Sequence, residues 1–453
     1  MSKRVVVITG DSLGVKMAGP AIRSWNMALE LSKANEVALV TTNFLEPGLI
    51  APFALHEVQP GRRAAFGALE QWADVIVFQG HGMSQFPVLR STNRVLVADI
   101  YDPMHLEMLE QGREQPPATW TMQVTTARSV LNQQLARADF FLCASERQRL
   151  FYLGHLAALG RINPATYGSD PHLDRLLAIA PFGLSSTPPQ HEKLALAGVV
   201  PGIEPGDQVL IWGGGLYSWF DPKTLIRAVA RVAETHPTVK LFFLGTRHPG
   251  VETMGIVGES FDLARELGAL DRSVFFNDTW VEFADRQNYL LEATAGVSTH
   301  MSHIETTFAF RTRILDYLWA GLPMIVTEGD SFAELVAQEG LGSVVPAEDV
   351  DALVAAIERT VFDTKFSGAA RENIARVRER FYWEYTLAPL VDFVATASHA
   401  EDYVRDRDGM ASVFAGGRKT HGLRHDLRMA WHHLRNGGLG AVTSRIRGRL
   451  GRR

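Results

Sequence analysis

The 453-residue sequence contains one cysteine, Cys143, so no disulfide can form within the chain. This scarcity favours a reducing, cytoplasmic compartment, and Cys143, inside the apolar run ADFFLCAS, is expected to be a small core residue. No run approaches the roughly 18 apolar residues that cross a bilayer, and the apolar stretch before Asp11 is too short for a signal peptide. Any membrane contact is therefore expected to be peripheral.

Two chemical signatures are also missing. No Cys and His residues show metal-ligand spacing, so we expect neither a metal ion nor another cofactor. A G-x-G-x-x-G fingerprint is absent after the first predicted strand, and the next one, VALVTT, does not end in an acidic residue. Both absences count against a nicotinamide-dependent oxidoreductase, an alternative that rests on the predicted sheets alone.

Positive and negative charges are unevenly distributed along the chain. The net charge is only −5, but residues 418–453 hold ten Lys or Arg and one acidic residue, which gives +9 and leaves −14 for residues 1–417. Leu423, Leu427, Trp431 and Leu434 fall on one helical stripe of this basic tail. The pattern favours an amphipathic helix on an anionic membrane surface, with a helix packed on the body or a solvated tail as alternatives. No nucleic-acid partner is expected.

What is present is an α/β pattern of short β-branched runs, each followed by helical periodicity. The length exceeds a single core of roughly 250 to 300 residues, so we predict two Rossmann-like, doubly wound parallel-sheet domains that face a cleft. Helices are expected between the strands, for example over residues 222–234 and 351–359. The strands are predicted at residues 4–9, 37–41, 74–79, 94–101, 139–144 and 177–181, and then at 209–212, 239–244, 274–277, 296–299, 324–327 and 343–345.

A proline-rich stretch separates the two strand series and predicts the domain boundary. The expected organisation is a first Rossmann-like domain, a linker, a second Rossmann-like domain, a helix that crosses back, and the basic tail, at residues 1–185, 186–206, 207–380, 381–400 and 401–453.

Glycine-rich loops follow the first strand of each predicted domain. Gly19 and Pro20 open a helix whose apolar stripe is expected to include Ile22, Leu29 and Leu31, and its free N–H groups suit an anion or a sugar. In the second domain, Gly213, Gly214 and Gly215 leave no side chains between the backbone and a bound diphosphate. Trp219 and Phe220 follow, as cleft or core residues.

The densest polar constellation is GVSTHMSHIETTFAFRTRILDYLWAGLPMIVTEGD. Here Ile314, Leu315 and Leu318 form the buried helical stripe, and Arg311 and Arg313 fall at the helix start, where cations oppose the helix dipole unless an anion shares the site. Guanidinium groups suit a nucleotide diphosphate. Because two residues two apart diverge by about 200° on a helix, one arginine could instead pair with Asp316 or another carboxylate.

Other polar residues lie near strand ends. His81 is flanked by two glycines, and His300 and His303 occupy the polar loop, so each is a candidate for bonding a sugar hydroxyl or phosphate and also for a structural role. Asp99 and Asp102 could hold an acceptor hydroxyl, although Asp before Pro also starts turns.

Together these motifs resemble a GT-B-fold glycosyltransferase of the family-4 (glycosyl transferases group 1) type, over residues 4–396. The resemblance rests on GPAIR after the first strand, the GGG loop, LDYLWAGLPMIVT, and FYWEYTLAPLVDFV with Trp383 and Glu384. It implies transfer of a sugar from a nucleotide-diphosphate donor to a glycan or lipid-linked acceptor, in polysaccharide or glycoconjugate synthesis, with retention of configuration and without a metal ion. A catalytically silent GT-B protein is the alternative.

The resemblance also assigns roles to residues. Asp316 takes the place of the second family glutamate, which binds the donor ribose. The place of the first falls on Phe308, so Glu305 takes its role only if the loop is longer. Glu305 and His81 are the predicted catalytic residues. An Arg and a Lys are missing near Gly215 and Phe220, which leaves the diphosphate to the GGG backbone, Arg311 and Arg313. The acceptor is expected near Gly19, His81 and Asp102.

Overall fold

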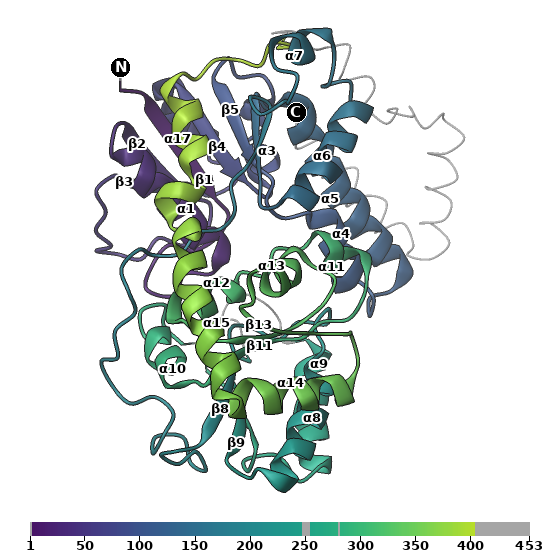
Figure 1. The fold of residues 1–453 in the computed structure, drawn as a ribbon. Helices are drawn as coiled ribbons and strands as arrows, with labels where there is room; N and C mark the ends of the chain where they lie inside the picture. The colour runs from purple at the N-terminus through teal and green to yellow at the C-terminus, as the bar shows by residue number, and fades with distance from the viewer. Residues whose placement is uncertain (1, 247–253, 280, 404–453) are drawn as a thin grey trace, which may run out of the picture. The chain divides into compact units, whose positions relative to one another are not determined.

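Runs of branched aliphatic residues form two parallel sheets in a computed structural model of the chain, which describes residues 2–246, 254–279 and 281–403 (Figure 1). The first sheet has the order β3-β2-β1-β4-β5-β6-β7 and the second β10-β9-β8-β11-β12-β13, with every printed strand pair parallel. In each sheet the order reverses beside the first strand, between β1 and β4 and between β8 and β11. Ligands bind at such reversals, outside the carboxyl ends of the strands.

The strands and helices of the first lobe lie within residues 4–179. Its strands are β1 (Arg4–Thr9), β2 (Glu36–Thr41), β3 (Ala54–Glu57), β4 (Val75–Gln79), β5 (Val95–Asp99), β6 (Phe140–Cys143) and β7 (Leu177–Ile179). Its helices are α1 (Gly19–Ser32), α2 (Arg63–Trp72), α3 (Gly82–Gln85), η1 (Pro87–Arg90), α4 (Met104–Gln111), α5 (Pro117–Arg137), α6 (Glu146–Ala158) and α7 (Pro164–Ser169).

The second lobe begins at residue 208. Its strands are β8 (Gln208–Trp212), β9 (Val239–Phe243), β10 (Val274–Phe276), β11 (Ala295–Ser298), β12 (Met324–Thr327) and β13 (Gly342–Val345). The helices from there onward are α8 (Pro222–Thr235), α9 (Gly255–Glu266), α10 (Arg286–Glu292), α11 (Ile304–Phe308), α12 (Arg313–Ala320), α13 (Ser331–Glu339), α14 (Val350–Phe362), α15 (Thr364–Val377), η2 (Arg378–Phe381), α16 (Trp383–Thr386) and α17 (Ala388–Ala395).

The predicted α/β class and all twelve predicted strands are confirmed, with strand ends that move by at most two residues. The strand β3 was not predicted, because ALHE holds few branched residues and lies half-exposed at the sheet edge. The expected stripe of α1 is partly wrong: Leu31 is buried, but Ile22 and Leu29 are only half-buried. The buried face of α1 instead carries Ala21, Arg23, Ser24, Met27, Ala28 and Leu31.

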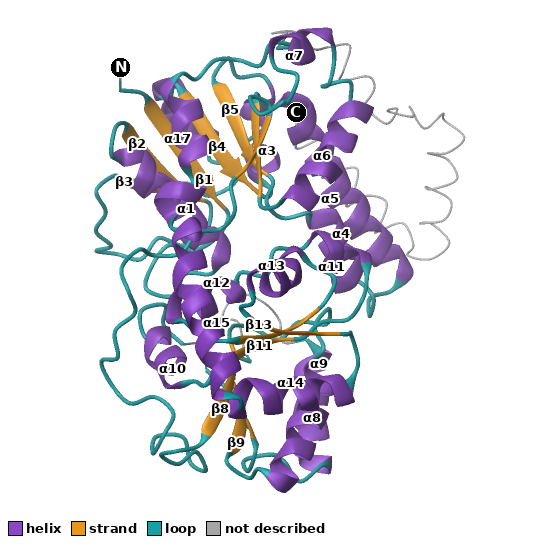
Figure 2. Cartoon of the chain, in the orientation of Figure 1, coloured by secondary structure: helices purple, strands orange, loops and turns teal. Residues whose placement is uncertain are grey.

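The core of each lobe follows from the alternation of side chains along buried strands. In β1, Val5 and Val7 pack on the face covered by α1 and α17, whereas Val6 and Ile8 pack on the face covered by α2, α5 and α6. Helices therefore cover both faces of the first sheet, as Figure 2 shows. Cys143 is fully buried in the second of these clusters, and burial raises the pKa of its thiol to about 12, as expected of a core residue.

Two segments connect the lobes. The irregular linker between β7 and β8 is fastened to α10, where the Glu292 carboxylate accepts hydrogen bonds from the N–H groups of Ala195, Leu196 and Ala197 at 2.8, 2.8 and 3.1 Å. At the other crossing, α17 returns to the first sheet (Figure 1). There Phe393 stacks on Phe140 with ring centroids 4.2 Å apart. Residues 1–403 form one compact unit.

The predicted amphipathic helix at residues 418–453 lies outside the described residues. Within the described ranges, no helix combines the length and the apolar character that a membrane crossing requires.

A buried ion pair fixes α1 to the first sheet. The guanidinium of Arg23, from the GPAIR segment, donates to both carboxylate oxygens of Asp99 at 2.7 and 2.8 Å and to Ala180 O at 2.8 Å, and both side chains are fully buried. Gln79 donates to the same carboxylate at 3.1 Å. The cation also lies over the rings of Tyr101 and Phe182. Both Tyr101 and Phe182 line the pocket described below, so this pair shapes its wall.

Replacing Arg23 by Met should therefore destabilise the protein by about 3 to 5 kcal/mol, because the Asp99 carboxylate would stay buried without its cation. Urea denaturation measures this change. The half-exposed pair of Arg4 and Asp74 is the control, and Arg4→Met should cost about 1 kcal/mol or less. Equal losses in the two variants would contradict the role given to the buried pair.

Candidate active site

A pocket of about 1130 Å³ lies where the carboxyl ends of the two sheets face each other. The loop after β1 and the start of α1 line one side, through Gly19 and Pro20. The loops after β8 and β11 and the start of α12 line the other side. Of the predicted site residues, the pocket is lined by Gly19, Asp102, Gly213, Gly214, Gly215, Glu305, Arg311, Arg313 and Asp316.

The glycine loop after β8 is held in a defined shape. Tyr317, from α12, has its hydroxyl 2.8 Å from Val297 O, and that hydroxyl accepts a hydrogen bond from Gly213 N–H at 2.9 Å. Burial raises the pKa of Tyr317 to about 12, so it remains a neutral hydroxyl. Gly214 has a φ of +87°, which favours glycine. The N–H groups of Gly214 and Gly215, unlike that of Gly213, have no partner among the described residues.

Arg313 brings a cation to the same loop from α12. Its Nη2 donates to Gly215 O at 3.1 Å, and its guanidinium lies 4.3 and 4.0 Å from the ring centroids of Trp212 and Phe220. The side chain is only 8% exposed, and its Nη1 has no hydrogen-bond partner within the described part of the chain. Burial lowers the pKa of Arg313 to about 10, which still leaves it charged at neutral pH.

The position of Arg313 accounts for the lack of an Arg and a Lys in the loop after β8. Arg313 places its guanidinium beside Gly215 and Phe220, the two positions at which the resemblance to family-4 enzymes led us to expect Arg and Lys. Phe220 and Trp219 are both buried in the core of the second lobe and also line the pocket. The two alternatives predicted for them, core residue and cleft residue, therefore apply together.

Arg311 makes a different contact. Its Nη1 and Nη2 donate to the two carboxylate oxygens of Glu305 at 3.0 and 2.7 Å, in a forked pair that is more than nine-tenths buried. The predicted pairing of one arginine with a carboxylate is thus present, but with Glu305 rather than Asp316. Asp316 instead accepts from Arg286 Nε at 3.0 Å, and Arg286 also lines the pocket. Phe308 stacks on Phe151, outside the pocket lining.

The histidines are not brought into the pocket. His81 is exposed and precedes α3. The glycine before it has a φ of +52°, so this glycine forms the turn between β4 and α3. His303 caps α11 by accepting from Thr306 N–H at 3.2 Å, and its other ring nitrogen lies 3.3 Å from Trp219 O. His300 is buried, with its ring 3.4 Å from Asp330. All three lie outside the pocket lining.

Acidic side chains dominate the wall that the first lobe contributes. Asp102, in the loop after β5, and Glu107, on α4, share a side-chain hydrogen bond, and Glu305 lies close enough to both to affect their titration. Burial, followed by the charge of Glu305, raises the pKa of Asp102 to about 6, and burial together with Asp102 raises the pKa of Glu107 well above its usual range. Near neutral pH this pair therefore retains a proton.

These raised pKa values predict a pH-dependent stability. Because burial raises the pKa of Asp102 from 3.8 to about 6, the folded protein binds more protons at this pair than the unfolded chain does, and stability should fall as the pH rises from about 4 through about 6. Asp102→Asn should remove part of this slope, on the order of 1 kcal/mol. Thermal unfolding at pH 5 and pH 7.5 measures the slope, and an unchanged slope in the variant would contradict the assignment.

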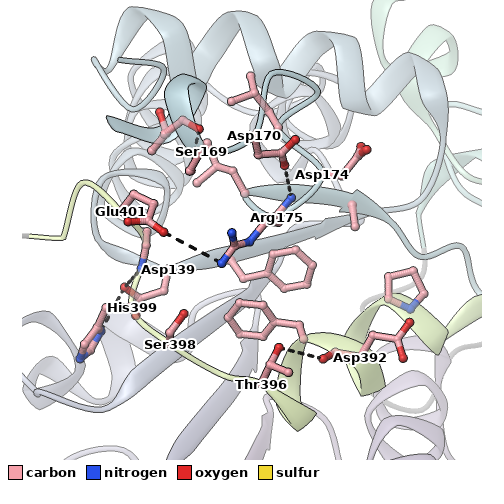
Figure 3. Close-up of a pocket in the computed structure, with 18 of the residues that line it drawn as sticks. Asp139, Ser169, Asp170, Asp174, Arg175, Asp392, Thr396, Ser398, His399 and Glu401 are labelled. Carbon is pink, nitrogen blue, oxygen red and sulfur yellow. Dashed lines mark hydrogen bonds and ion pairs between the residues drawn. The ribbon is translucent and has the colours of Figure 1, made fainter. Parts of the chain in front are cut away.

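A second pocket, of about 670 Å³, lies where the segment after α17 meets the first lobe (Figure 3). Residues after α17 contact the first lobe there: the Asp139 carboxylate accepts from Ala400 N–H at 3.1 Å and lies 3.2 Å from His399, and Arg175 Nη2 lies 4.0 Å from Glu401. These contacts fasten the segment after α17 to the first lobe.

Comparison with known proteins agrees with this geometry. Residues 207–363 match the family model described as glycosyl transferases group 1, and this range contains the GGG loop, Glu305 and α12. This part of the chain is therefore similar to group 1 glycosyl transferases. A search of curated proteins gave no match. Among the described residues, no group of three or more His, Cys, Asp or Glu side chains is placed to hold a metal ion.

Solved structures of the GT-B type share the fold of this chain at low sequence identity. Sucrose-phosphate synthase from Thermosynechococcus elongatus is 18% identical with a TM-score of 0.65, and the match covers 87% of this chain and 100% of that one. WaaG, a glycosyltransferase involved in lipopolysaccharide biosynthesis, is 16% identical with a TM-score of 0.58, over 91% and 100%. HepE from Anabaena, solved with UDP, is 14% identical with a TM-score of 0.59, over 87% and 100%.

Sequence reasoning missed three residues of the site: Glu107, Arg286 and Tyr317. Glu107 and Arg286 line the pocket from helices whose sequences carry no motif, and Tyr317 acts through backbone groups. The only available signal was Tyr317 itself, a polar aromatic residue one position from Asp316 on a helix whose buried face was already predicted.

Proposed function

We propose that this protein is a glycosyltransferase, which transfers a sugar from a nucleotide-diphosphate donor bound in the pocket of the second lobe. The observation that carries the proposal is the buried guanidinium of Arg313, which has an unpartnered Nη1 beside the unpartnered N–H groups of Gly214 and Gly215. A buried cation with a spare donor, next to backbone donors, suits a diphosphate. The structures of HepE with UDP and UDP-glucose support this donor class.

The other pocket residues receive roles by position. Asp316, steadied by Arg286, would hold the ribose hydroxyls, as the resemblance to family-4 enzymes implies. Glu305 would face the transferred sugar, where the reaction develops oxocarbenium character. Because Arg311 occupies both oxygens of Glu305, the carboxylate is oriented as an electrostatic stabiliser rather than a free nucleophile, which fits transfer with retained configuration.

The acceptor would lie against the first lobe, near Gly19 and Asp102. The pocket-lining residues described in this lobe include Asp11, Asp102 and Glu107, with Trp25 and Tyr101, and no Lys or Arg. Carboxyl groups and aromatic rings bind sugar hydroxyls and faces, whereas an anionic group would be repelled here. We therefore propose that a neutral glycan end, free or carried on a lipid, is the acceptor, in polysaccharide or glycoconjugate synthesis.

The departing diphosphate would be stabilised by Arg313 and the loop N–H groups, so that no metal ion is required. Closing the pocket to water would limit hydrolysis of the donor. At residues 418–453, the basic segment would bring the enzyme to the cytoplasmic face of a membrane, and liposome binding by full-length and truncated protein tests this location.

A thermal-shift screen of nucleotide sugars, followed by product analysis with neutral and phosphorylated acceptors, tests the function. We expect stabilisation by one nucleotide diphosphate series and transfer to a neutral acceptor. Failure of every nucleotide to bind would overturn the donor assignment, and preference for phosphorylated acceptors would overturn the acceptor assignment. Neither the oxidoreductase nor the silent-protein alternative is favoured by an observation in the described structure.

A further inference from the structure

A fully buried amide joins the two lobes next to the pocket. Gln148 lies in the first turn of α6, with its side chain completely buried. Its Nε2 donates to Tyr101 O at 2.7 Å, within the first lobe, and to Phe308 O at 2.8 Å, in the second lobe. Its Oε1 accepts from Ala144 N–H at 2.7 Å. Three backbone partners therefore fix the orientation of this amide.

The two carbonyls lie beside the two carboxylates of the site. Tyr101 directly precedes Asp102, and Phe308 is the last residue of α11, the helix that carries Glu305. One side chain thus connects the backbone of the Asp102 loop with that of the Glu305 helix. The helix α11 also packs against α4 and α6 of the first lobe.

The short helix α11 depends on these contacts. It has five residues, and the carbonyls at the end of any helix need partners outside it. The first lobe supplies them, since Arg147 Nη1 donates to Thr307 O at 3.4 Å and Gln148 donates to Phe308 O. Arg147 also forms an ion pair with Glu334 of α13 at 2.5 Å. Separating the lobes would leave the end of α11 without these partners.

We propose that Gln148 is a positioning residue, which holds Glu305 opposite Asp102 only while the lobes are together. The inference rests on the proposed role of Glu305 toward the transferred sugar. The donor's diphosphate would be bound by the second lobe alone, so its binding does not require Gln148. Turnover does require it, because the carboxylate of one lobe must be aligned with the acceptor on the other.

Gln148→Met tests this role, because it keeps the length of the side chain and removes both donors. We expect the dissociation constant for UDP, or for the nucleoside diphosphate found in the screen, to change less than about twofold, while kcat falls about 10- to 100-fold. The fraction of donor hydrolysed rather than transferred should rise.

The matched control is Gln134→Met. Gln134 is an equally buried glutamine of the first lobe, and its Nε2 donates to Gly80 O within that lobe, so it removes a buried amide without touching the lobe contact. It should leave kcat and the hydrolysed fraction unchanged. Equal falls of kcat in the two variants, or a wild-type kcat in Gln148→Met, would overturn the proposal.

Gln148→Glu adds a readout that loss of stability alone would not move. The glutamate keeps an oxygen for Ala144 N–H but turns the other toward two carbonyls, so its activity should recover as the pH is lowered and the carboxyl gains a proton to donate. If Gln148→Met does not fold, Arg147→Ala, in a partly exposed side chain, should give a smaller change in the same direction.

Hydrogen exchange separates this proposal from the proposed function. Amides of residues 304–312 should exchange about tenfold faster in Gln148→Met than in Gln134→Met, whether or not a donor is known. Unchanged exchange there would overturn the positioning role even if the wild-type enzyme is active. Faster exchange in an enzyme that binds no nucleotide would instead leave the lobe contact standing and overturn the donor assignment.

Discussion

Arg313→Ala should raise the dissociation constant for the nucleoside diphosphate by about 10- to 100-fold, the loss expected for hydrogen bonds to a charged group. The reason is the spare Nη1 of a cation that is already desolvated, so its contact with a diphosphate carries little further desolvation cost. Isothermal titration with UDP, or with the nucleotide selected by the screen, measures the change.

Two variants sharpen this experiment. Arg313→Lys keeps a charge but not the planar fork over Trp212 and Phe220, so it should restore only part of the affinity. Arg311→Ala should change nucleotide affinity by less than about threefold, because its guanidinium is committed to Glu305. Unchanged affinity in Arg313→Ala, or equal losses in the two alanine variants, would contradict the division of roles.

The sequence alone treats these two arginines alike, and the reason lies in what periodicity can convey. Helical spacing predicts that two residues two positions apart diverge, but it does not say which one reaches the sheet. Arg313 is the first residue of α12 and turns toward β8, whereas Arg311 precedes the helix and turns toward α11. The hydrogen-bond partner of Arg313, Gly215, lies 98 positions away along the chain, whereas that of Arg311, Glu305, lies six positions away.

Strands were easier to predict than the site, because a strand that is buried on both faces of a sheet consists almost entirely of apolar residues. Short branched apolar runs such as VVVIT and VLIW are typical of buried strands in an α/β chain. Loops at the carboxyl ends of these strands were correctly expected to line a pocket. The prediction for His81 shows the limit of that rule: it follows β4, beside the reversal of strand order, yet its side chain is exposed outside the pocket.

Contacts between the lobes cannot be predicted from the residues next to them in the sequence. Gln148 lies in an ordinary helix start, SERQRL, and its two carbonyl partners are 47 and 160 residues away along the chain. A buried glutamine in a helical first turn is equally compatible with a local cap. Only the three-dimensional structure shows that Gln148 bonds residues of both lobes rather than capping its own helix.

Glu305→Gln should lower kcat by about 100- to 1000-fold while leaving nucleotide affinity within about twofold. Oxocarbenium character develops next to this side chain in the proposed reaction, and an amide of the same shape offers no full negative charge to stabilise it. The substitution also keeps one oxygen for Arg311, so the geometry of α11 is largely retained. Initial rates with the donor and acceptor found in the screen measure the effect.

Glu305→Ala separates charge from structure. It would leave the Arg311 guanidinium buried, with Thr306 at 3.3 Å and Asp330 at 4.0 Å as its remaining polar neighbours, so it should lower both kcat and the unfolding temperature. Glu358→Gln, in an exposed carboxylate on α14, is the control for removing a charge from the same lobe and should keep kcat within about threefold. A wild-type rate in Glu305→Gln would mean that the negative charge at this position does not act on the transferred sugar. The stabilisation would then have to come from Arg313 and the glycine loop acting on the leaving diphosphate, which the Arg313 variants measure independently.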